Sequence, residues 1–159
     1  MHAPKKSDLP VITAAELANA DGIIFGAPTR FGTLPAQMKA FLDSCGQLWA
    51  KYGFFDFRGA LTNKFAGFFT SAATQHGGIE TTVLTFLPFC IHLGMMFVPV
   101  GYANPNVSIV DNVFGGSPYG ASTIAGPDGS HSPTEKELEL ANFQGSHFAK
   151  VVGQFHKGK

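Results

Sequence analysis

The chain has 159 residues, which is the size of one ordinary domain and enough to bury a hydrophobic core. It carries 11 basic and 11 acidic residues and no formal net charge, so its charge does not favour binding to nucleic acid or to an anionic membrane. No apolar stretch reaches the roughly 18–20 uncharged residues that a membrane span requires. The segment 1–12 is polar and broken by proline, unlike a secretory signal peptide.

The two cysteines, Cys45 and Cys90, lie far apart in the sequence and form no CxxC motif. They also lack the clustered histidines of a zinc site. We therefore expect both to be reduced core residues of a cytoplasmic protein, and we expect no metal site.

The first predicted elements are a short helix, a buried strand and an amphipathic helix. Thr13 and Glu16 form a capping-box pattern that predicts a helix through Ala20. The run GIIFG at 22–26 has no polar alternation, which is typical of a strand buried on both faces. From Pro35 onward, apolar residues at helical spacing predict one continuous helix: Met38, Phe41, Leu42, Cys45, Leu48 and Trp49.

The middle of the chain predicts two further buried strands with a helix between them. The strands are FAGFFTS at 65–71 and MMFVPVGY at 95–102. The helix covers 79–93, with Pro88 bending it and Gly94 ending it.

The last third of the chain predicts a long functional loop and a closing helix. The segment 103–131 is rich in Gly, Pro, Asn and Ser, which favours a loop with a functional role. Ser132 and Glu135 form a second capping-box pattern, with Pro133 at the first helical position. The predicted buried face of this helix consists of Leu138, Ala141, Phe148, Val151, Val152 and Phe155.

Alternating strands and helices predict a single α/β domain with a parallel sheet and helices on both of its faces. Ligands of such sheets bind in the loops that leave the carboxyl ends of the strands. Three loops meet this description: APTRFG, TSAATQHGG and GYANPN…GGSPYG. They offer backbone amides, hydroxyls and the guanidinium of Arg30 to a flat polar ligand.

Four motifs, in this order along the chain, resemble the tryptophan-repressor-binding-protein (WrbA-like) family of flavodoxin-like NAD(P)H:quinone oxidoreductases. The motifs are GIIFGAPTRFG…AQMKAFLDSCGQLW, FTSAATQHGGIETT, HLGMMFVPVGY and GGSPYGASTIAGPDGS. The similarity extends from about Leu9 to the closing helix. It implies a flavodoxin-like fold with strand order 2-1-3-4-5, an FMN cofactor, NAD(P)H as the electron donor, a quinone substrate and a homotetramer.

The resemblance also implies which residues meet the flavin and the substrate. The first loop would wrap one side of the isoalloxazine, and the second would lie along the ring and the ribityl chain. Trp49 and Tyr119 would line the substrate space. The implied cofactor-binding residues are Pro28, Thr29, Arg30, Phe31, Gly32, Ser71, Ala72, Ala73, Thr74, Gln75, His76, Gly77 and His92.

Five of these residues have an equally simple structural interpretation. Arg30 fits an exposed surface charge, and His76 fits an exposed turn beside two glycines. Trp49 fits a core or interface position. His92 fits a side chain that complements the dipole at a helix C-terminus. Tyr119 fits a residue that only packs the long loop.

The chain departs from the family pattern in three places. This fold binds the FMN phosphate in a polar loop after the first strand, at a helix N-terminus, and no such segment is found here. We therefore expect a domain that is N-terminally incomplete, with the strand at 22–26 at the edge of the sheet and weak FMN binding. SAAT stands where the family more often has STGT, and FFDFRG at 54–59 is an insertion after Trp49.

Two functions stay open at this point. One is FMN-dependent two-electron reduction of quinones by NAD(P)H, with both substrates using the same slot in a ping-pong reaction. The other is a truncated, non-catalytic flavodoxin-like protein, or an interaction partner, that does not hold FMN tightly. Other chemistries lack their motifs, because GGSPYG is not a G-x-S-x-G elbow and no dinucleotide fingerprint or P-loop is present.

Overall fold

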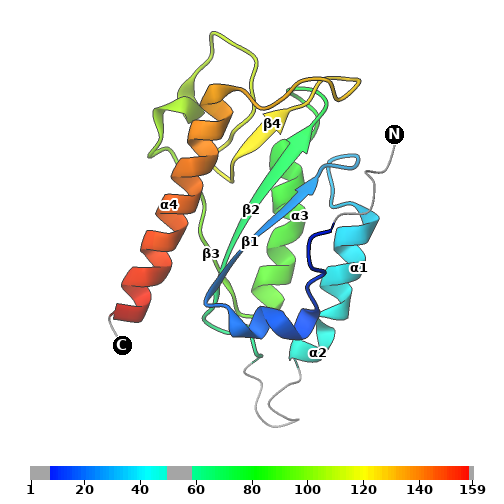
Figure 1. The fold of residues 1–159 in the computed structure, drawn as a ribbon, viewed down its shortest axis with the longest axis vertical. Coiled ribbons are helices and arrows are strands. Elements are labelled where there is room, and N and C mark those ends of the chain that lie inside the picture. Colours follow the sequence, from blue (N-terminus) through cyan, green and yellow to red (C-terminus); the bar gives the residue numbers. More distant parts are fainter. Residues whose placement is uncertain (1–7, 50–58, 158–159) are drawn as a thin grey trace.

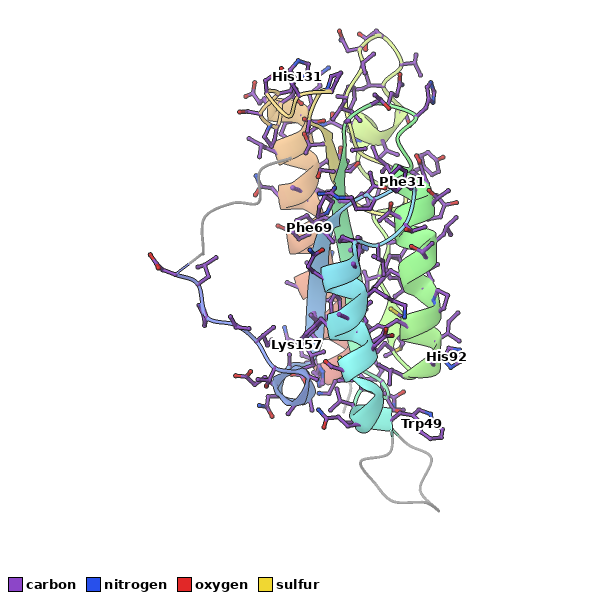
Figure 2. All side chains as sticks on the ribbon, turned by 90° about the vertical axis from the view of Figure 1, so that its right-hand side faces the viewer. Phe31, Trp49, Phe69, His92, His131 and Lys157 are labelled. Carbon is purple, nitrogen blue, oxygen red and sulfur yellow. The ribbon has the colours of Figure 1, made fainter. Side chains whose placement is uncertain are left out.

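The computed structural model describes residues 8–49 and 59–157, which form one parallel sheet with helices on both faces, as predicted (Figure 1). The strands are β1 (Gly22–Pro28), β2 (Phe65–Ala72), β3 (Met96–Phe97) and β4 (Ser122–Ile124). The helices are η1 (Ala14–Asn19), α1 (Ala36–Ser44), α2 (Gly46–Trp49), α3 (Ile79–His92), η2 (Pro105–Ser108) and α4 (Glu135–Lys157). Figure 2 shows α1 and α3 on one side of the sheet and α4 on the other.

The central strand is β2, and every strand pair in the sheet is parallel. It pairs with β1 along its length, from Gly22 opposite Phe65 to Pro28 opposite Ser71. On its other side β2 pairs with β3 near its start and with β4 near its end. The carboxyl ends of all the strands therefore lie together at one end of the sheet, which we call the carboxyl edge.

The main core lies between the sheet and the helices α1, α2 and α3. Its centre is the ring of Phe86 on α3, which lies 4.9 Å from the ring of Phe25 and 4.8 Å from the ring of Phe68, centroid to centroid. On the opposite face, a Cβ at Gly22 would lie 2.7 Å from the Phe148 ring of α4. Glycine at that strand position therefore allows α4 to approach the sheet closely.

Within the described residues β1 pairs only with β2, so β1 is an edge strand, as expected. Cavities of about 610 Å³ and 980 Å³ flank this edge, and Ile24 lines both of them. The first cavity lies on the α4 face, where Phe69 is half exposed and its ring covers Gly26. An apolar edge without lysine or inward charge is a surface on which further chain can pair.

Four predictions about the elements need correction. The helix expected over 35–49 is broken at Cys45 into α1 and α2. The strand expected over 95–102 is limited to Met96–Phe97, since Pro99 has no N–H to continue a ladder. The loop expected over 103–131 contains η2 and β4.

The fourth correction concerns the start of α4. The capping box is formed by Thr134 and Glu137, two residues later than the predicted pair. The buried face shifts with it, so that Leu138 is 52% exposed while Leu140 is buried. The prediction followed apolar residues alone, and polar side chains occupy part of the buried stripe.

The two cysteines are free and buried, in line with the prediction. Burial raises the pKa of Cys90 to about 12, which keeps its thiol protonated and unreactive at neutral pH. Burial also raises the pKa of Cys45.

Candidate functional site

The loops that follow β1 and β2 are joined by a chain of hydrogen bonds at the carboxyl edge of the sheet. The Thr29 N–H donates to the Ser71 carbonyl at 2.9 Å. The hydroxyl oxygen of Thr82, in the first turn of α3, lies 2.7 Å from both the Thr29 hydroxyl and the Gly78 carbonyl. Because a carbonyl only accepts, Thr82 donates to Gly78 and receives the hydrogen of Thr29. The side chains thus connect both loops to α3.

Two glycines allow these loops to touch. A Cβ built at Gly78 would lie 2.5 Å from the Cα of Gly32, which is closer than any side chain permits. Both glycines also have positive φ angles, +74° for Gly32 and +93° for Gly78. The close approach and the backbone conformation both require glycine at these positions.

The tip of the first loop presents an aromatic ring and a guanidinium to solvent. Arg30 and Thr33 exchange backbone hydrogen bonds of 2.9 and 3.0 Å, which closes a tight turn around Phe31. Phe31 has a φ of 53°, an uncommon conformation for a non-glycine residue, and its side chain is fully exposed (Figure 2). Arg30 donates from its guanidinium to the Thr29 carbonyl at 2.8 Å. Such strain and exposure are typical of ligand-contacting turns.

The second loop offers backbone donors. Thr74, Gln75 and His76 are exposed, and their N–H groups find no acceptor within the part of the chain that the structure describes. The Gly77 N–H donates to the Thr74 carbonyl, which closes the loop. The structure therefore brings together the predicted residues of the two loops: Pro28, Thr29, Arg30, Phe31 and Gly32 with Ser71, Ala72, Ala73, Thr74, Gln75, His76 and Gly77.

Three other predicted residues lie elsewhere in this chain. His92 ends α3, about 20 Å along the helix from the two loops. With Trp49, which is 52% exposed, it lines a cavity of about 430 Å³ that runs between α1, α2 and α3. Both side chains lie at the end of the molecule opposite the two loops (Figure 2). Tyr119 lies in the turn Ser117–Gly120, on the side of β2 that faces away from β1. The flavin-binding role of His92 and the substrate-lining roles of Trp49 and Tyr119 stay predictions.

Sequence reasoning missed two buried polar residues of α4 that support the carboxyl edge. Glu137 is 4% exposed and accepts from the N–H groups of Gly115 and Ile124 and from the hydroxyl of Thr123. Gln144 accepts from the Ala121 N–H at 3.0 Å and donates to the Phe68 carbonyl at 2.9 Å.

These two residues fix the segment before and through β4 against the sheet. Their spacing of seven on one helix face was the available signal, because it places both in the stripe that packs inward.

Hydrogen bonding sets the charge state of Glu137. Burial alone would raise its pKa, but the N–H groups of Thr134, Gly115 and Ile124 and the hydroxyl of Thr123 outweigh that effect. The pKa of Glu137 is consequently held below its usual range. The carboxylate is ionised at neutral pH, and its acceptor sites are engaged by the chain itself.

Two further findings concern membrane spans and metal binding. No helix in residues 8–49 and 59–157 is long and apolar enough to cross a membrane. Across the same residues, no three His, Cys, Asp or Glu side chains gather in a way that could hold a metal ion.

The parallel sheet with helices on both faces and loops paired at its carboxyl edge places the chain among the flavodoxin-like proteins. It is similar to a flavodoxin, WrbA-like protein from Agrobacterium tumefaciens, with a TM-score of 0.64 and 25% identity over 88% of this chain and 71% of the other. The model of the NADPH-dependent FMN reductase family matches residues 7–107. The chain belongs to this family, as a WrbA-like member.

Curated relatives are similar along most of the chain. A protein of Geobacter sulfurreducens named NAD(P)H dehydrogenase (quinone) is 50% identical over 148 residues, which are 93% of this chain and 70% of the relative. Quinone-oxidoreductase QR2 of Triphysaria versicolor is 51% identical over 153 residues, covering 96% of this chain and 71% of the relative. The resemblance predicted from the motifs is therefore confirmed.

Proposed function

We propose that this chain reduces quinones with electrons from NAD(P)H and that it holds the ring end of FMN between the loops Pro28–Gly32 and Ser71–Gly77. The observation that carries the proposal is the contact between these loops at the carboxyl ends of neighbouring parallel strands, where open α/β sheets bind ligands. The names of the family and of the relatives support both the electron donor and the quinone acceptor.

The residues of the two loops fit a flavin ring. A flavin carries carbonyl and nitrogen acceptors along one edge and gains negative charge on reduction. The exposed N–H groups of Thr74, Gln75 and His76 are suitable donors for such an edge. Arg30 uses guanidinium N–H to bind the Thr29 carbonyl, and a guanidinium has further donors for an anion. These residues would hold the ring.

FMN, when bound, would supply the redox chemistry, in which a hydride from NAD(P)H is passed on to the quinone and a proton from water completes the hydroquinone. The chain contributes orientation and shielding. The bonds from Thr29 to Ser71 and to Thr82 keep the two loops at a fixed separation. The exposed ring of Phe31 supplies an apolar wall that excludes water from a slot for flat substrates. With one slot, NAD(P)H and the quinone must bind in turn, which gives ping-pong kinetics.

Trp49 and His92 enter this proposal only as residues of a second copy of the chain. They lie together at the end of α3 that is remote from the loops, so they do not reach a flavin held by their own chain. A homotetramer would supply such neighbours. A cytoplasmic location, expected from the reduced cysteines, and a substrate-lining role for Tyr119 belong to the same proposal.

The open edge of β1 favours one alternative, a protein that docks to other flavodoxin-like chains without holding FMN tightly. Ile24, Gly26 and Pro28 border both cavities beside this edge, so a large apolar surface is available there. In that case quinone reduction would be absent while association persists.

FMN titration of the purified chain tests the proposal. We expect quenching of flavin fluorescence, flavin-dependent oxidation of NAD(P)H by a simple benzoquinone, and weaker FMN binding in Arg30→Ala. Lys150→Ala removes an exposed charge from α4, far from the loops in sequence, and serves as the matched control. Equal FMN affinity in both variants would remove Arg30 from the site. No flavin binding and no turnover by the wild-type chain, together with stable association, would favour the alternative.

A further inference from the structure

A further cavity, distinct from the three described above, adjoins the second loop on the side away from β1. It has a volume of about 610 Å³ and lies between the second loop, β4 and the start of α4. We call it the His131 cavity, and its principal lining residues are Ala73, Thr74, Gln75, Val113, Ile124 and His131. The proposed flavin site uses the same loop from its other side, so the two sites share the segment 73–75.

The imidazole of His131 forms a flat wall of this cavity. A Cβ built at Gly126 would lie 3.3 to 3.4 Å from three ring atoms of His131, and such equal distances mean that the ring turns its face to Gly126. His131 is exposed and lies at the carboxyl end of the sheet, near the start of α4 (Figure 2). The backbone N–H of His131 donates to the Ala125 carbonyl, which fixes its position in the turn. The ring thus packs on Gly126 and lines the cavity.

The remaining walls combine apolar surface with one amide. Val113 is 66% exposed although it is large and apolar, and Ile124 and Ala73 add further aliphatic surface. Gln75 carries the one side-chain amide of the lining. Glu137 also borders the cavity, but its oxygens already accept from the Gly115 and Ile124 N–H groups and from three donors of Thr123 and Thr134. The negative charge of Glu137 is therefore already stabilised by donors of the chain itself.

We propose that the His131 cavity binds the adenosine half of NAD(P)H while the nicotinamide reaches the flavin site, an inference that rests on the proposed function. Adenine has two apolar faces that stack on imidazole and aliphatic side chains, and its N6–N7 edge pairs with a glutamine amide. The flavin site lies at the ends of β1 and β2 and the His131 cavity lies beside β2 and β4, and β1 and β4 are two strand spacings apart, about 10 Å. A dinucleotide has its two rings at opposite ends, and the quinone, having no adenosine, would not use this cavity.

Direct binding of adenosine nucleotides tests the inference without FMN and without turnover. Adenosine 5′-monophosphate and adenosine 2′,5′-bisphosphate are titrated against the chain while the His131 Cε1–H resonance, assigned with His131→Asn, is followed by NMR. We expect saturable shifts at His131 and unchanged shifts at His147, which lies on α4 beside Phe143. Similar affinities for both nucleotides would indicate that the shared adenosine dominates, and tighter binding of the bisphosphate would add a contact to the NADPH phosphate.

Two variants make the test decisive. His131→Ala should weaken nucleotide binding about tenfold, the loss expected when one stacking partner is removed. Val113→Glu, at an exposed position, places a carboxylate in the cavity and should weaken binding further. His147→Asn should bind as the wild type does. In the FMN-loaded enzyme, His131→Ala should raise the KM for NAD(P)H and leave the quinone KM unchanged.

Absence of a shift at His131, or equal nucleotide affinity in all three variants, would overturn the inference even if quinone reduction is observed. Conversely, nucleotide binding at His131 without quinone reduction would support the cavity and contradict the proposed function. The failures of the two proposals are thus distinguishable.

Discussion

Removing the carboxylate of Glu137 should destabilise the fold more than any other single change at the start of α4. One oxygen of Glu137 accepts from the Gly115 N–H at 2.7 Å and the Ile124 N–H at 3.0 Å. The other accepts from the Thr134 N–H at 2.7 Å, the Thr134 hydroxyl and the Thr123 hydroxyl. Glu137→Ala leaves these donors without their acceptor, and among them the Gly115 N–H belongs to a buried residue.

The magnitude follows from how far each stranded donor is open to water. The Gly115 N–H is buried and unsatisfied donors of that kind cost about 1–3 kcal/mol, whereas the bonds from Ile124 and Thr134 are worth less because these residues are half-buried and exposed, respectively, so the free energy of unfolding should fall by roughly 2–4 kcal/mol. Glu137→Gln should cost less. Its amide oxygen can keep accepting the hydrogen bonds from the Gly115 and Ile124 N–H groups. Its NH₂ group, however, would face the Thr134 N–H, and two donors cannot form a hydrogen bond.

Urea unfolding at several pH values checks this reasoning. The folded-state pKa of Glu137 lies below its unfolded value of about 4.3, so its stabilisation is present above that pH and is lost as the pH falls through the folded pKa. The wild type should therefore approach Glu137→Gln in stability as the solution becomes acidic. Glu135→Ala, an exposed change in the same first turn, is the control. Equal stability of Glu135→Ala and Glu137→Ala would refute the account.

Three further predictions follow from other parts of the fold. Gly120→Ala should prevent stable folding in thermal unfolding experiments, because its Cβ would clash with the Phe68 carbonyl oxygen. Gly153→Ala on α4 is the control: its Cβ would meet no atom within 4 Å, so the change should be neutral or stabilising by up to ~1 kcal/mol. Thr82→Val should weaken FMN binding about tenfold in a fluorescence titration, since it removes the hydroxyl that connects α3 to Thr29, and an unchanged affinity would show that the connection is dispensable. Ile24→Lys puts a charge on the open edge of β1 and should shift the chain toward the monomer, as measured by light scattering. A mass equal to that of the wild type would show that the chain associates through another surface.

The sequence predicted those parts of the fold in which local pattern and packing agree. The apolar runs that became β1 and β2 are continuous and bounded by glycine or polar residues, so both form strands of a parallel sheet. The predicted burial on both faces is wrong for β1, which is largely half-buried because it lies at the edge of the sheet. The capping box at Thr13 and the stop at Gly94 also depend on neighbouring residues alone. The loops at Thr29 and Thr74 could be predicted as a site because parallel strands bring their carboxyl ends together.

The parts that escaped prediction depend on residues distant in sequence. Ser122–Ile124 becomes a strand because β2 leaves half of one edge unpaired beyond the short β3, and its two β-branched residues form too short a run, between glycine-rich segments, to predict a strand from the sequence. Glu137 and Gln144 are buried because their side-chain oxygens accept hydrogen bonds from backbone N–H groups of the segment 115–124. Hydrophobic periodicity cannot predict such polar positions, because it counts only apolar residues. The separation of His92 from the loops follows from the length of α3, and that of Trp49 follows from the combined length of α1 and α2. The order of motifs along the sequence does not reveal either distance.

The central claim is that the paired loops after β1 and β2 hold the flavin ring. Its most direct test is the amide NMR spectrum of the isotope-labelled chain during titration with FMN. The account predicts that the largest shifts fall on Phe31, Gly32, Thr74 and His76, with Gly153 on α4 unchanged. Saturable FMN binding whose largest shifts fall outside Pro28–Gly32 and Ser71–Gly77 would contradict it.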